Sequence, residues 1–256
     1  MKIRNSTYQL TDEDRAVIHD AHEIGIGVLH EMFSEDEVEK IRIDFTQAHE
    51  DAGLGELVPA KRVSLRCVSL FQYPHLGPLY YHPRIMAIVS AILGEPNPWL
   101  YQYKTNRYTP VHEGVKKHTD GFGGLVPAHQ TQAMAIFLDD ISAESGALTY
   151  VPRTHLLYYT DREPPKDSAP SKEDLDNGEY IPLEVKPGSV LFRVPEMWHA
   201  VIPIHHLRRY VTAAYVRKSN TSETCQKKVA ESVEQRKEID TSRFPPEILR
   251  MWDYWD

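Results

Sequence analysis

The sequence predicts a mainly β protein, a sandwich or a closed barrel, with flanking helices that cover one face of a sheet. From Trp99 onward, short segments rich in β-branched and aromatic residues alternate with turns that contain Gly, Pro and Asp. Ahead of Trp99, apolar residues recur at the spacing of amphipathic helices. The chain has 256 residues, 41% of them hydrophobic, and no evident internal repeat, so we expect one domain with a full core.

Three helices are expected ahead of the β-rich part, each with a start signal in the sequence. The first two begin with capping boxes, which pair a Ser or Thr with an acid three residues later. The third has Pro at its first turn and Gly as its stop. Two apolar stretches between the helices predict strands. The helices start at Thr11, Ser34 and Pro83 and end near His22, Gly53 and Gly94, and the strands lie within IGIGVLH and RVSLRCVSLF.

Seven further short strands are expected from Trp99 onward. Each is a run of apolar and β-branched residues bounded by turn residues, which is typical of sandwiches and barrels. In chain order the strands are WLYQYK, QAMAIFL, ALTYV, YIPLEV, SVLFRV, HAVIPI and YVTAAYV.

Two segments outside these strands differ in composition. Residues 160–179 are rich in charge, Pro, Ser and Asp and predict a surface insertion, either a solvated loop or a lid over a pocket. A polar helix follows Lys218, and then a tail whose Trp252, Tyr254 and Trp255 we expect to dock on the domain or on a second subunit. The single domain, 1–256, thus divides into a helical region of about 1–95, a barrel of about 96–218 and a C-terminal helix and tail at 219–256.

Composition argues against several classes of partner. The net charge of −8 provides no basic surface for nucleic acid. No apolar run approaches the roughly 20 residues of a membrane helix, and the first residues lack the apolar region of a signal peptide. The sparse cysteines, Cys67 and Cys225, suit a reducing cytosol better than a disulfide framework. We therefore expect a soluble, cytoplasmic protein that acts on a small molecule, as a monomer or a homodimer.

The stretch VKKHTDGFGG, residues 115–124, contains the pair His118 and Asp120. On a strand, residues i and i+2 point to the same face, so the imidazole and the carboxylate would aim at one point. Two such ligands and a distant histidine form the 2-His-1-carboxylate triad, which binds Fe(II) and leaves coordination positions open. An H-x-D pair alone is weak evidence, because any histidine-rich chain produces one by chance.

His199 is the candidate third ligand. A Pro-Gly turn, the strand SVLFRV and a second turn deliver it to the start of HAVIPI. It stands 79 residues after Asp120, so only tertiary structure could join the two, as a barrel of short antiparallel strands would. A lone histidine beside Trp198 would be a structural residue, but the H-x-D pair makes the ligand interpretation the stronger one.

The other histidines have weaker claims to a metal. His205 and His206 lie on the polar turn HHLRR, where we expect exposure to solvent. His112, His129 and His155 have no partner at ligand spacing and are left out of the metal set.

Arg208 and Arg209 lead into the strand YVTAAYV, shortly after His199. A guanidinium presents a rigid fork that binds a carboxylate through two parallel hydrogen bonds. Neighbours on a strand face opposite sides, so only one of the two can point into a barrel and anchor a dicarboxylic cosubstrate. Without the triad, both would be read as surface charges.

Four blocks of the chain together resemble the phytanoyl-CoA dioxygenase family of Fe(II)/2-oxoglutarate oxygenases. The resemblance runs from about Gly25 to Tyr215, and each block alone is weakly specific. The family's turn Pro-Gly-Ser/Thr-His appears here as Pro152 to His155, with Arg153 in place of the usual Gly. The blocks are KKHTDGFGG, AIFLDDISAESGALTYVPRTH, VKPGSVLFRVPEMWHAV and RRYVTAAYV.

The resemblance implies a double-stranded β-helix, a jelly-roll or cupin-like barrel, with iron held by His118, Asp120 and His199. It also implies that Fe(II), 2-oxoglutarate and O2 act together. Such an enzyme hydroxylates an unactivated C–H of a small-molecule metabolite and releases succinate and CO2. Asp120 favours hydroxylation, because related halogenases carry a small apolar residue in its place.

The resemblance further implies that an arginine binds the distal carboxylate of 2-oxoglutarate. Spacing to the strand end favours Arg208, but the segment after His199 is shorter than the family's, so Arg209 stays open. Lys104 matches a lysine position often found near the cosubstrate, and Gln102 is a candidate for the same wall.

Other interpretations remain open at this point. The same iron site would also support desaturation, epoxidation or ring formation. A metal-dependent isomerase or dioxygenase on this barrel would need no 2-oxoglutarate, and a non-enzymatic jelly-roll binding module would need no iron. The aromatic residues Tyr101, Tyr103, Phe122 and Trp198 are either a substrate lining or, more simply, barrel core.

Overall fold

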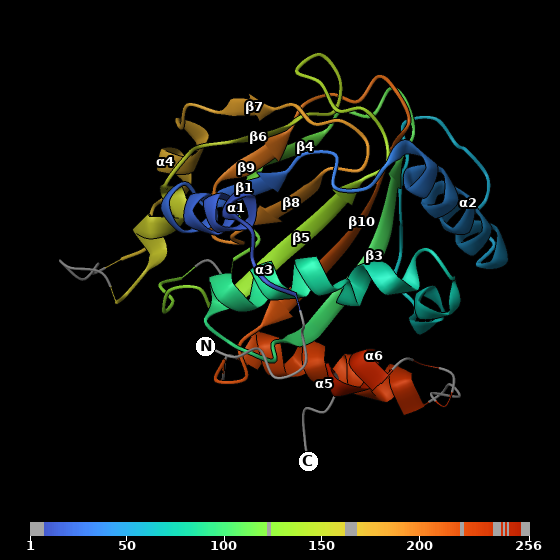
Figure 1. Cartoon of the computed structure of the whole chain (residues 1–256). Helices are drawn as coiled ribbons and strands as arrows, with labels where there is room; N and C mark the ends of the chain where they lie inside the picture. Colours follow the sequence, from blue (N-terminus) through green and yellow to red (C-terminus); the bar gives the residue numbers. More distant parts are fainter. Residues whose placement is uncertain are drawn as a thin grey trace.

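Two antiparallel sheets face each other, as the computed structural model shows for residues 8–121, 124–161, 168–220, 223–237, 242, 244 and 246–251 (Figure 1). The larger sheet has the strand order β1-β8-β5-β10-β3-β2, and the smaller one β4-β9-β6-β7. The strands are β1 (Ile26–Leu29), β2 (Arg62–Leu65), β3 (Trp99–Tyr108), β4 (Val115–His118), β5 (Thr131–Phe137), β6 (Leu148–Tyr150), β7 (Ile181–Leu183), β8 (Val190–Arg193), β9 (His199–Val201) and β10 (Arg208–Val216).

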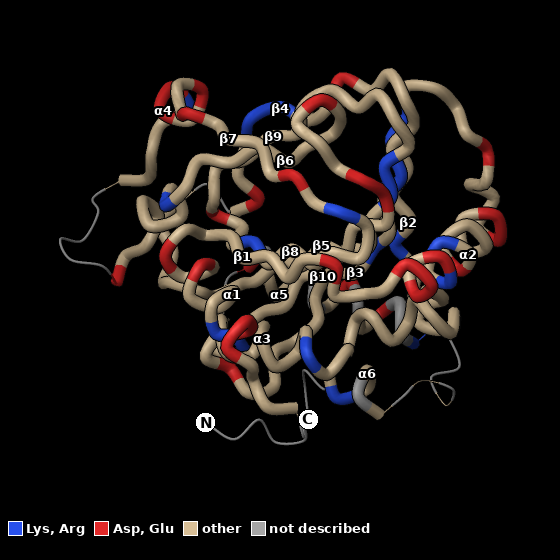
Figure 2. Tube along the Cα trace, turned by 45° about the horizontal axis from the view of Figure 1, so that its top comes forward, with Lys and Arg blue, Asp and Glu red and all other residues tan. Residues whose placement is uncertain are grey.

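The smaller sheet lies over the middle of the larger one, so that the two enclose a barrel interior (Figure 2). All seven strands expected after Trp99 form, and β4 is an eighth. Two strands of the larger sheet, β1 and β2, come from the part of the chain expected to be mostly helical. The prediction of a mainly β protein with flanking helices is confirmed.

The helices expected ahead of Trp99 begin and end close to the residues that the sequence signals predict. Thr11 and Ser34 each accept from the backbone N–H three residues later and complete their capping boxes. Gly94 ends the third helix in the left-handed conformation, φ +62°. The α-helices are α1 (Asp12–Glu23), α2 (Glu35–Asp51), α3 (Pro83–Leu93), α4 (Lys172–Asp176), α5 (Glu223–Lys237) and α6 (Pro246–Arg250), and the 3-10 helices are η1 (Val68–Gln72), η2 (Gly77–Tyr81) and η3 (Thr154–Tyr158).

Two segments contain helices that the sequence analysis did not predict. The strand expected within RVSLRCVSLF forms as β2, which ends at Leu65, and the 3-10 helix η1 follows. The insertion 160–179 contains α4, which Ser171 caps, and residues 162–167 of it lie outside the described part. The aromatic tail residues from Trp252 onward also lie outside the described residues.

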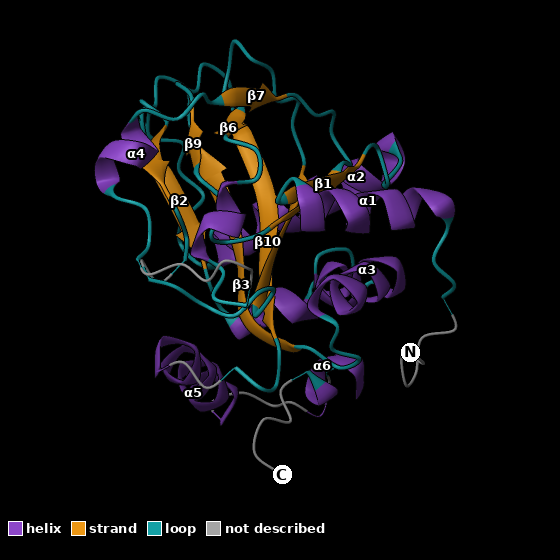
Figure 3. Ribbon diagram, turned by 90° about the vertical axis from the view of Figure 1, so that its left-hand side faces the viewer, coloured by secondary structure: helices purple, strands orange, loops and turns teal. Residues whose placement is uncertain are grey.

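Helices α1 and α3 pack along the outer face of the larger sheet, opposite the smaller sheet (Figure 3). Strand alternation sorts the side chains between these two faces. On β3, Tyr101 and Tyr103 point outward into the main hydrophobic core, while Gln102 and Lys104 point into the barrel. The first pair is therefore core, and the polar pair faces the interior.

Among the described residues, neither Cys67 nor Cys225 forms a disulfide bond. None of the described helices combines the length and the apolar character needed to cross a bilayer.

His49 is a buried imidazole that links α2 to β3. Its Nε2 lies 2.9 Å from Thr105 Oγ1, and its ring stacks on Phe45 at 4.5 Å between centroids. Burial, with a smaller contribution from the charge of Arg107, lowers the pKa of His49 to about 4. The imidazole is therefore neutral in the folded chain under conditions where the unfolded chain would protonate it.

We expect this histidine to lower the stability of the folded protein in acid. Its folded pKa lies below the unfolded value, so the stability it contributes is complete above pH 6.5 and falls as the pH drops toward 4. Between pH 7 and 5 the loss should be about 2 kcal/mol of unfolding free energy. Urea unfolding of the wild type and of His49→Phe at both pH values measures it, and an equal drop in both proteins would contradict the assignment.

Candidate metal centre and cavity

His118 and His199 meet across the smaller sheet. They are directly opposite each other in the β4–β9 pair, and their ring centroids are 4.1 Å apart. Asp120 joins them two residues after the end of β4. One ligand atom from each of the three residues lies within 4.8 Å of the other two. The structure therefore brings together all three residues that the sequence analysis singled out for a metal.

Asp120 reaches the site by a different route from the one expected. Because β4 ends at His118, the H-x-D pair does not lie on one continuous strand, and the i, i+2 argument does not apply to it. Instead, the turn after β4 is held by the backbone N–H of Asp120, which donates to the carbonyl of Pro195 at 2.9 Å. This bond fixes the carboxylate beside the turn that precedes His199.

Both imidazoles are oriented by the backbone. His118 Nδ1 lies 2.7 Å from the carbonyl of Lys116, and His199 Nδ1 lies 2.9 Å from that of Met197. A carbonyl only accepts, so each Nδ1 carries a hydrogen, and Nε2 is the ring atom left to bind a metal. The two Nε2 atoms lie 3.4 Å and 3.7 Å from the carboxylate oxygens of Asp120. Two imidazoles and a carboxylate, held by a second layer of hydrogen bonds, are a donor set that fits a divalent metal such as iron.

Arg193 is a neighbour of the site that the sequence analysis missed. Its Nη2 donates to Asp120 Oδ2, and its Nη1 lies 3.2 Å from His199 Nδ1. Burial would raise the pKa of Asp120, but Arg193 and the two histidines hold it well below its usual value. Burial and the charge of Arg193 lower the pKa of His199. The site is thus ionised at Asp120 and neutral at His199, as metal binding requires.

A cavity of about 180 Å³ extends from the three residues into the barrel. Its walls come from both sheets, and alanines form much of the part contributed by β5 and β10. Lining residues are Arg62, Gln102, Lys104, Tyr108, Val115, His118, Asp120, Ala133, Met134, Ala135, Phe137, Leu148, Leu191, Arg193, His199, Val201, Arg208, Tyr210, Thr212, Ala213 and Ala214.

Arg208 points into this cavity. Only 3% of its surface is exposed, and its guanidinium lies 4.5 Å from the ring centroid of Tyr210 and 5.7 Å from that of Phe137. Its Nε and Nη1 have no hydrogen-bond partner among the described residues. A buried cation with two unused donors is poised to receive an anion.

Arg209 faces the other way. Its side chain donates to both carboxylate oxygens of Asp139, at 3.1 Å and 2.7 Å, and it does not line the cavity. The alternation along β10 therefore separates the two arginines between the barrel interior and the outside.

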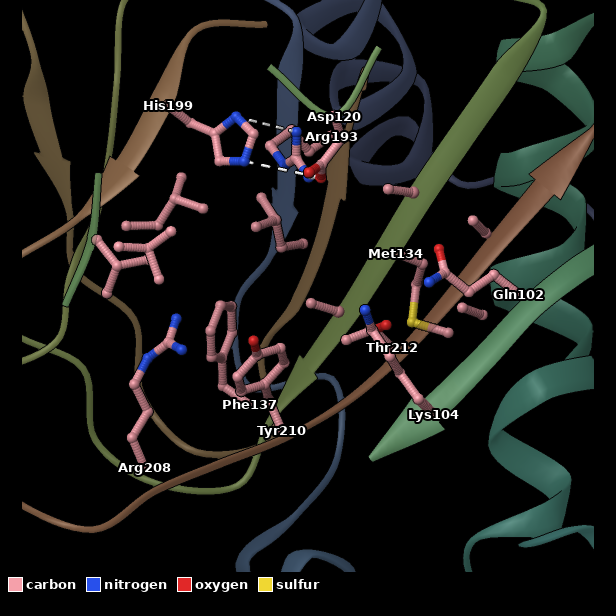
Figure 4. A pocket seen from close by; sticks show the side chains of 18 of the residues that line it. Gln102, Lys104, Asp120, Met134, Phe137, Arg193, His199, Arg208, Tyr210 and Thr212 are labelled. Atoms are coloured by element: carbon pink, nitrogen blue, oxygen red, sulfur yellow. Dashed lines mark hydrogen bonds and ion pairs between the residues drawn. The ribbon is translucent and has the colours of Figure 1, made fainter. Parts of the chain in front are cut away.

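Gln102 and Lys104 line the cavity from β3, as Figure 4 shows, on the side away from Arg208. Of the aromatic residues considered as a substrate lining, Tyr101, Tyr103 and Trp198 do not line it. Trp198 is buried, and its Nε1 donates to Tyr158 at 3.0 Å, while Phe122 lies outside the described residues.

The remaining histidines lie where they were expected. His205 and His206 are exposed. His155 is buried, and its Nε2 lies 3.0 Å from the carbonyl of His22, which is a structural contact between η3 and α1. None of these three belongs to the group around Asp120.

Comparison with known proteins gives the fold a context. The family model of phytanoyl-CoA dioxygenase (PhyH) matches residues 21–204. No curated protein matches the chain. Among solved structures, SnoK, a non-heme alpha-ketoglutarate-dependent carbocyclase from nogalamycin biosynthesis, is 21% identical, with a TM-score of 0.64 over 84% of this chain and 87% of that chain.

Two further solved structures contain a metal. HygX from Streptomyces hygroscopicus, with nickel and 2-oxoglutarate bound, is 17% identical, with a TM-score of 0.63 over 83% of this chain and 89% of that chain. EctD from S. alaskensis, with bound Fe, is 17% identical, with a TM-score of 0.65 over 85% of this chain and 83% of that chain. At these identities the likeness establishes the shared fold, and the jelly-roll barrel predicted from the sequence is confirmed.

Proposed function

The chain belongs to the phytanoyl-CoA dioxygenase family and is an Fe(II)/2-oxoglutarate-dependent oxygenase, and on this premise we propose that it hydroxylates an unactivated C–H of a small-molecule metabolite. The observation that carries the proposal is the group of two imidazoles and one carboxylate at His118, His199 and Asp120. Succinate and CO2 would be the other products.

In this proposal the iron ligands are His118 Nε2, His199 Nε2 and the carboxylate of Asp120. The backbone carbonyls behind each Nδ1 keep both lone pairs directed at the metal. Arg193 keeps the carboxylate ionised and limits its rotation. When bound, iron together with 2-oxoglutarate and O2 supplies an oxidant strong enough to remove hydrogen from a C–H bond.

We assign the distal carboxylate of 2-oxoglutarate to Arg208. Nε and Nη1 of this buried residue have no hydrogen-bond partner among the described residues, so its guanidinium has donors for a carboxylate. Leu148, Leu191 and Val201 line the same cavity and offer apolar contact to the methylene groups of the cosubstrate. Arg209 has no part in this assignment because it is paired with Asp139 outside the cavity.

Asp120 supports hydroxylation over halogenation. As a metal ligand, its carboxylate would take the coordination position that a halide would need. Desaturation, epoxidation and ring formation are the alternatives with the same ligands. The mass of the product separates hydroxylation from desaturation and ring formation, because hydroxylation adds one oxygen atom and those two reactions remove two hydrogens.

Anaerobic titration with Fe(II) tests the proposal directly. A visible charge-transfer absorption band is expected only when Fe(II) and 2-oxoglutarate are both present. Under ¹⁸O2 in place of air, the hydroxylated product should contain one ¹⁸O atom. A folded protein that gives no band with both additions would contradict the proposed function.

Gly146 makes room for Arg208 and provides a second, finer test. It adopts φ +71°, and a Cβ placed there would lie 3.0 Å from Arg208 Cδ. We expect Gly146→Ala to weaken 2-oxoglutarate binding about tenfold, because the bidentate pair depends on alignment. Backbone strain should also destabilise the fold by roughly 1–2 kcal/mol.

Gly53→Ala is the matched control for this variant. Gly53 has a similar φ of +69°, but a Cβ there meets nothing within 4 Å. The two variants should unfold at similar temperatures, and only Gly146→Ala should bind 2-oxoglutarate more weakly by calorimetry. Equal affinities in the two variants would show that Gly146 does not position Arg208.

A further inference from the structure

We propose that Thr154 is a positioning residue of the metal centre, and that its hydroxyl group holds the turn at residues 194–198 in the geometry that metal binding requires. Thr154 lies in the 3-10 helix η3 and does not line the cavity. The proposal rests on the function proposed above, because it concerns the ligands of the same site. It assigns a role in metal binding to a side chain that does not coordinate the metal.

The turn at residues 194–198 supports two of the three candidate ligands. It delivers His199 to the start of β9. Its Pro195 carbonyl accepts from the backbone N–H of Asp120 at 2.9 Å, and its Met197 carbonyl accepts from His199 Nδ1 at 2.9 Å. A displacement of this turn would therefore shift both ligands and rotate one imidazole.

Thr154 holds the end of the turn next to His199. The backbone N–H of Trp198 donates to Thr154 Oγ1 at 3.0 Å, and the threonine hydroxyl donates to the carbonyl of Val151 at 2.8 Å. The backbone N–H of Val151 donates in turn to the carbonyl of Trp198 at 3.1 Å. The peptide groups on both sides of Trp198 are thus fixed directly before a metal ligand.

The start of the turn and the helix η3 share one anchor, the backbone that follows α1. Gly25 accepts from the N–H of Val194 at 2.9 Å, and its neighbour Ile24 accepts from the N–H of Arg153 at 2.8 Å. A Cβ on Gly25 would lie 2.5 Å from His155 Nδ1, so η3 packs against this backbone with no room for a side chain. The hydroxyl of Thr154 therefore connects the turn to a firmly packed support.

The indole of Trp198 strengthens the same connection. Its Nε1 donates to the hydroxyl of Tyr158, also in η3, at 3.0 Å. Thr154 and Trp198 are each 6% exposed, so water has little access to these hydrogen bonds. The outer partners of metal ligands typically change metal affinity by about 10–100-fold. Thr154 acts one peptide further out than the carbonyls that orient the imidazoles, so we expect an effect at the lower end of this range.

The test compares the wild type with Thr154→Val, Thr154→Ser and Thr109→Val. Valine keeps the shape of threonine and removes the hydroxyl, whereas serine keeps the hydroxyl. The dissociation constant of Fe(II) alone is measured by anaerobic calorimetry. The position of the visible band after addition of 2-oxoglutarate and the unfolding temperature without ligands are measured on the same proteins.

Thr109 is the matched control because it makes the same kind of contact elsewhere. It is 3% exposed, its Oγ1 accepts from the backbone N–H of Lys61 at 2.8 Å, and its hydroxyl donates to the carbonyl of Val58. It holds the loop before β2 and does not line the cavity. Each valine variant leaves one buried backbone N–H without its partner, so the two should unfold at similar temperatures below that of the wild type.

We expect Thr154→Val to raise the dissociation constant of Fe(II) about tenfold and to shift the visible band. Thr154→Ser should bind Fe(II) within twofold of the wild type. Thr109→Val should also bind within twofold, despite its loss of stability. This pattern would separate the positioning of the ligands from a general weakening of the fold.

Hydrogen exchange of the wild type tests the same coupling without any variant, so it decides the question if Thr154→Val does not fold. Coupling between two events is reciprocal, so a contact that favours metal binding is itself strengthened by the metal. With Zn(II) as a diamagnetic probe for NMR, the Trp198 amide should exchange about tenfold more slowly than in the metal-free protein. The Lys61 amide, which donates to Thr109, should exchange at an unchanged rate.

Three results would overturn the inference and leave the proposed function intact. They are wild-type Fe(II) affinity in Thr154→Val, an equal loss of affinity in Thr154→Ser and Thr154→Val, and a Trp198 amide whose exchange does not respond to the metal. A folded wild type that binds no Fe(II) would instead refute the proposed function, and this inference would fail with it.

Discussion

His199→Ala is expected to abolish the visible band of the Fe(II)–2-oxoglutarate complex and all succinate release. His199 is 4% exposed and stands opposite His118, so no other described side chain can replace its Nε2 at this point of the sheet. Removing an outer partner of a metal ligand already costs about 10–100-fold in metal affinity. Removing the ligand itself should cost more than about 100-fold.

His205→Ala is the control for this prediction. His205 is an exposed histidine in the same part of the chain, and it is not part of the group around Asp120. Anaerobic titration should give the wild-type band for His205→Ala and none for His199→Ala, with both proteins folded by circular dichroism. A full band in His199→Ala would exclude it as an iron ligand.

Arg208→Met should raise the dissociation constant of 2-oxoglutarate by about 30- to 4,000-fold. This range corresponds to the 2–5 kcal/mol typically lost when one partner of a buried charged pair is removed. Without ligand, the same variant should be as stable as the wild type or more stable. The reason is that the buried guanidinium has two donors without hydrogen-bond partners, so replacing it relieves a desolvation cost.

Arg209→Met provides the matched comparison. It breaks the ion pair with Asp139 outside the cavity and should leave 2-oxoglutarate affinity unchanged. Calorimetry with 2-oxoglutarate and thermal unfolding of the ligand-free proteins measure both effects. Weakened binding in Arg209→Met of the same size as in Arg208→Met would refute the assignment of the inner arginine.

Much of the fold could be predicted because local signals and tertiary structure agree. The capping boxes at Thr11 and Ser34 and the stop at Gly94 appear as expected. Each of these signals is satisfied within a few residues, so it needs no knowledge of the rest of the chain. The 3-10 helix after Leu65 was not predicted, because its apolar residues suit a 3-10 helix as well as a strand.

Only part of the candidate site could be predicted from the sequence, because the rest depends on strand register. The pair Arg208 and Arg209 carried no sign of which residue faces inward until β10 paired with its neighbours. Arg193 was missed, although an arginine at the end of the apolar strand VLFR was a usable signal. A charged residue on a strand buried on both faces needs a partner, and here the partner is Asp120.

The direct pairing of His118 with His199 makes the chemistry of the site sensitive to how the smaller sheet forms. A slip of one residue between paired strands turns every side chain to the other face. The β4–β9 pair is short and already contains an irregularity between Val115 and His118. A misregistered β4–β9 pair would separate the two imidazoles. An error in the register of these few residues would therefore abolish metal binding, and a measurement of stability alone would not detect it.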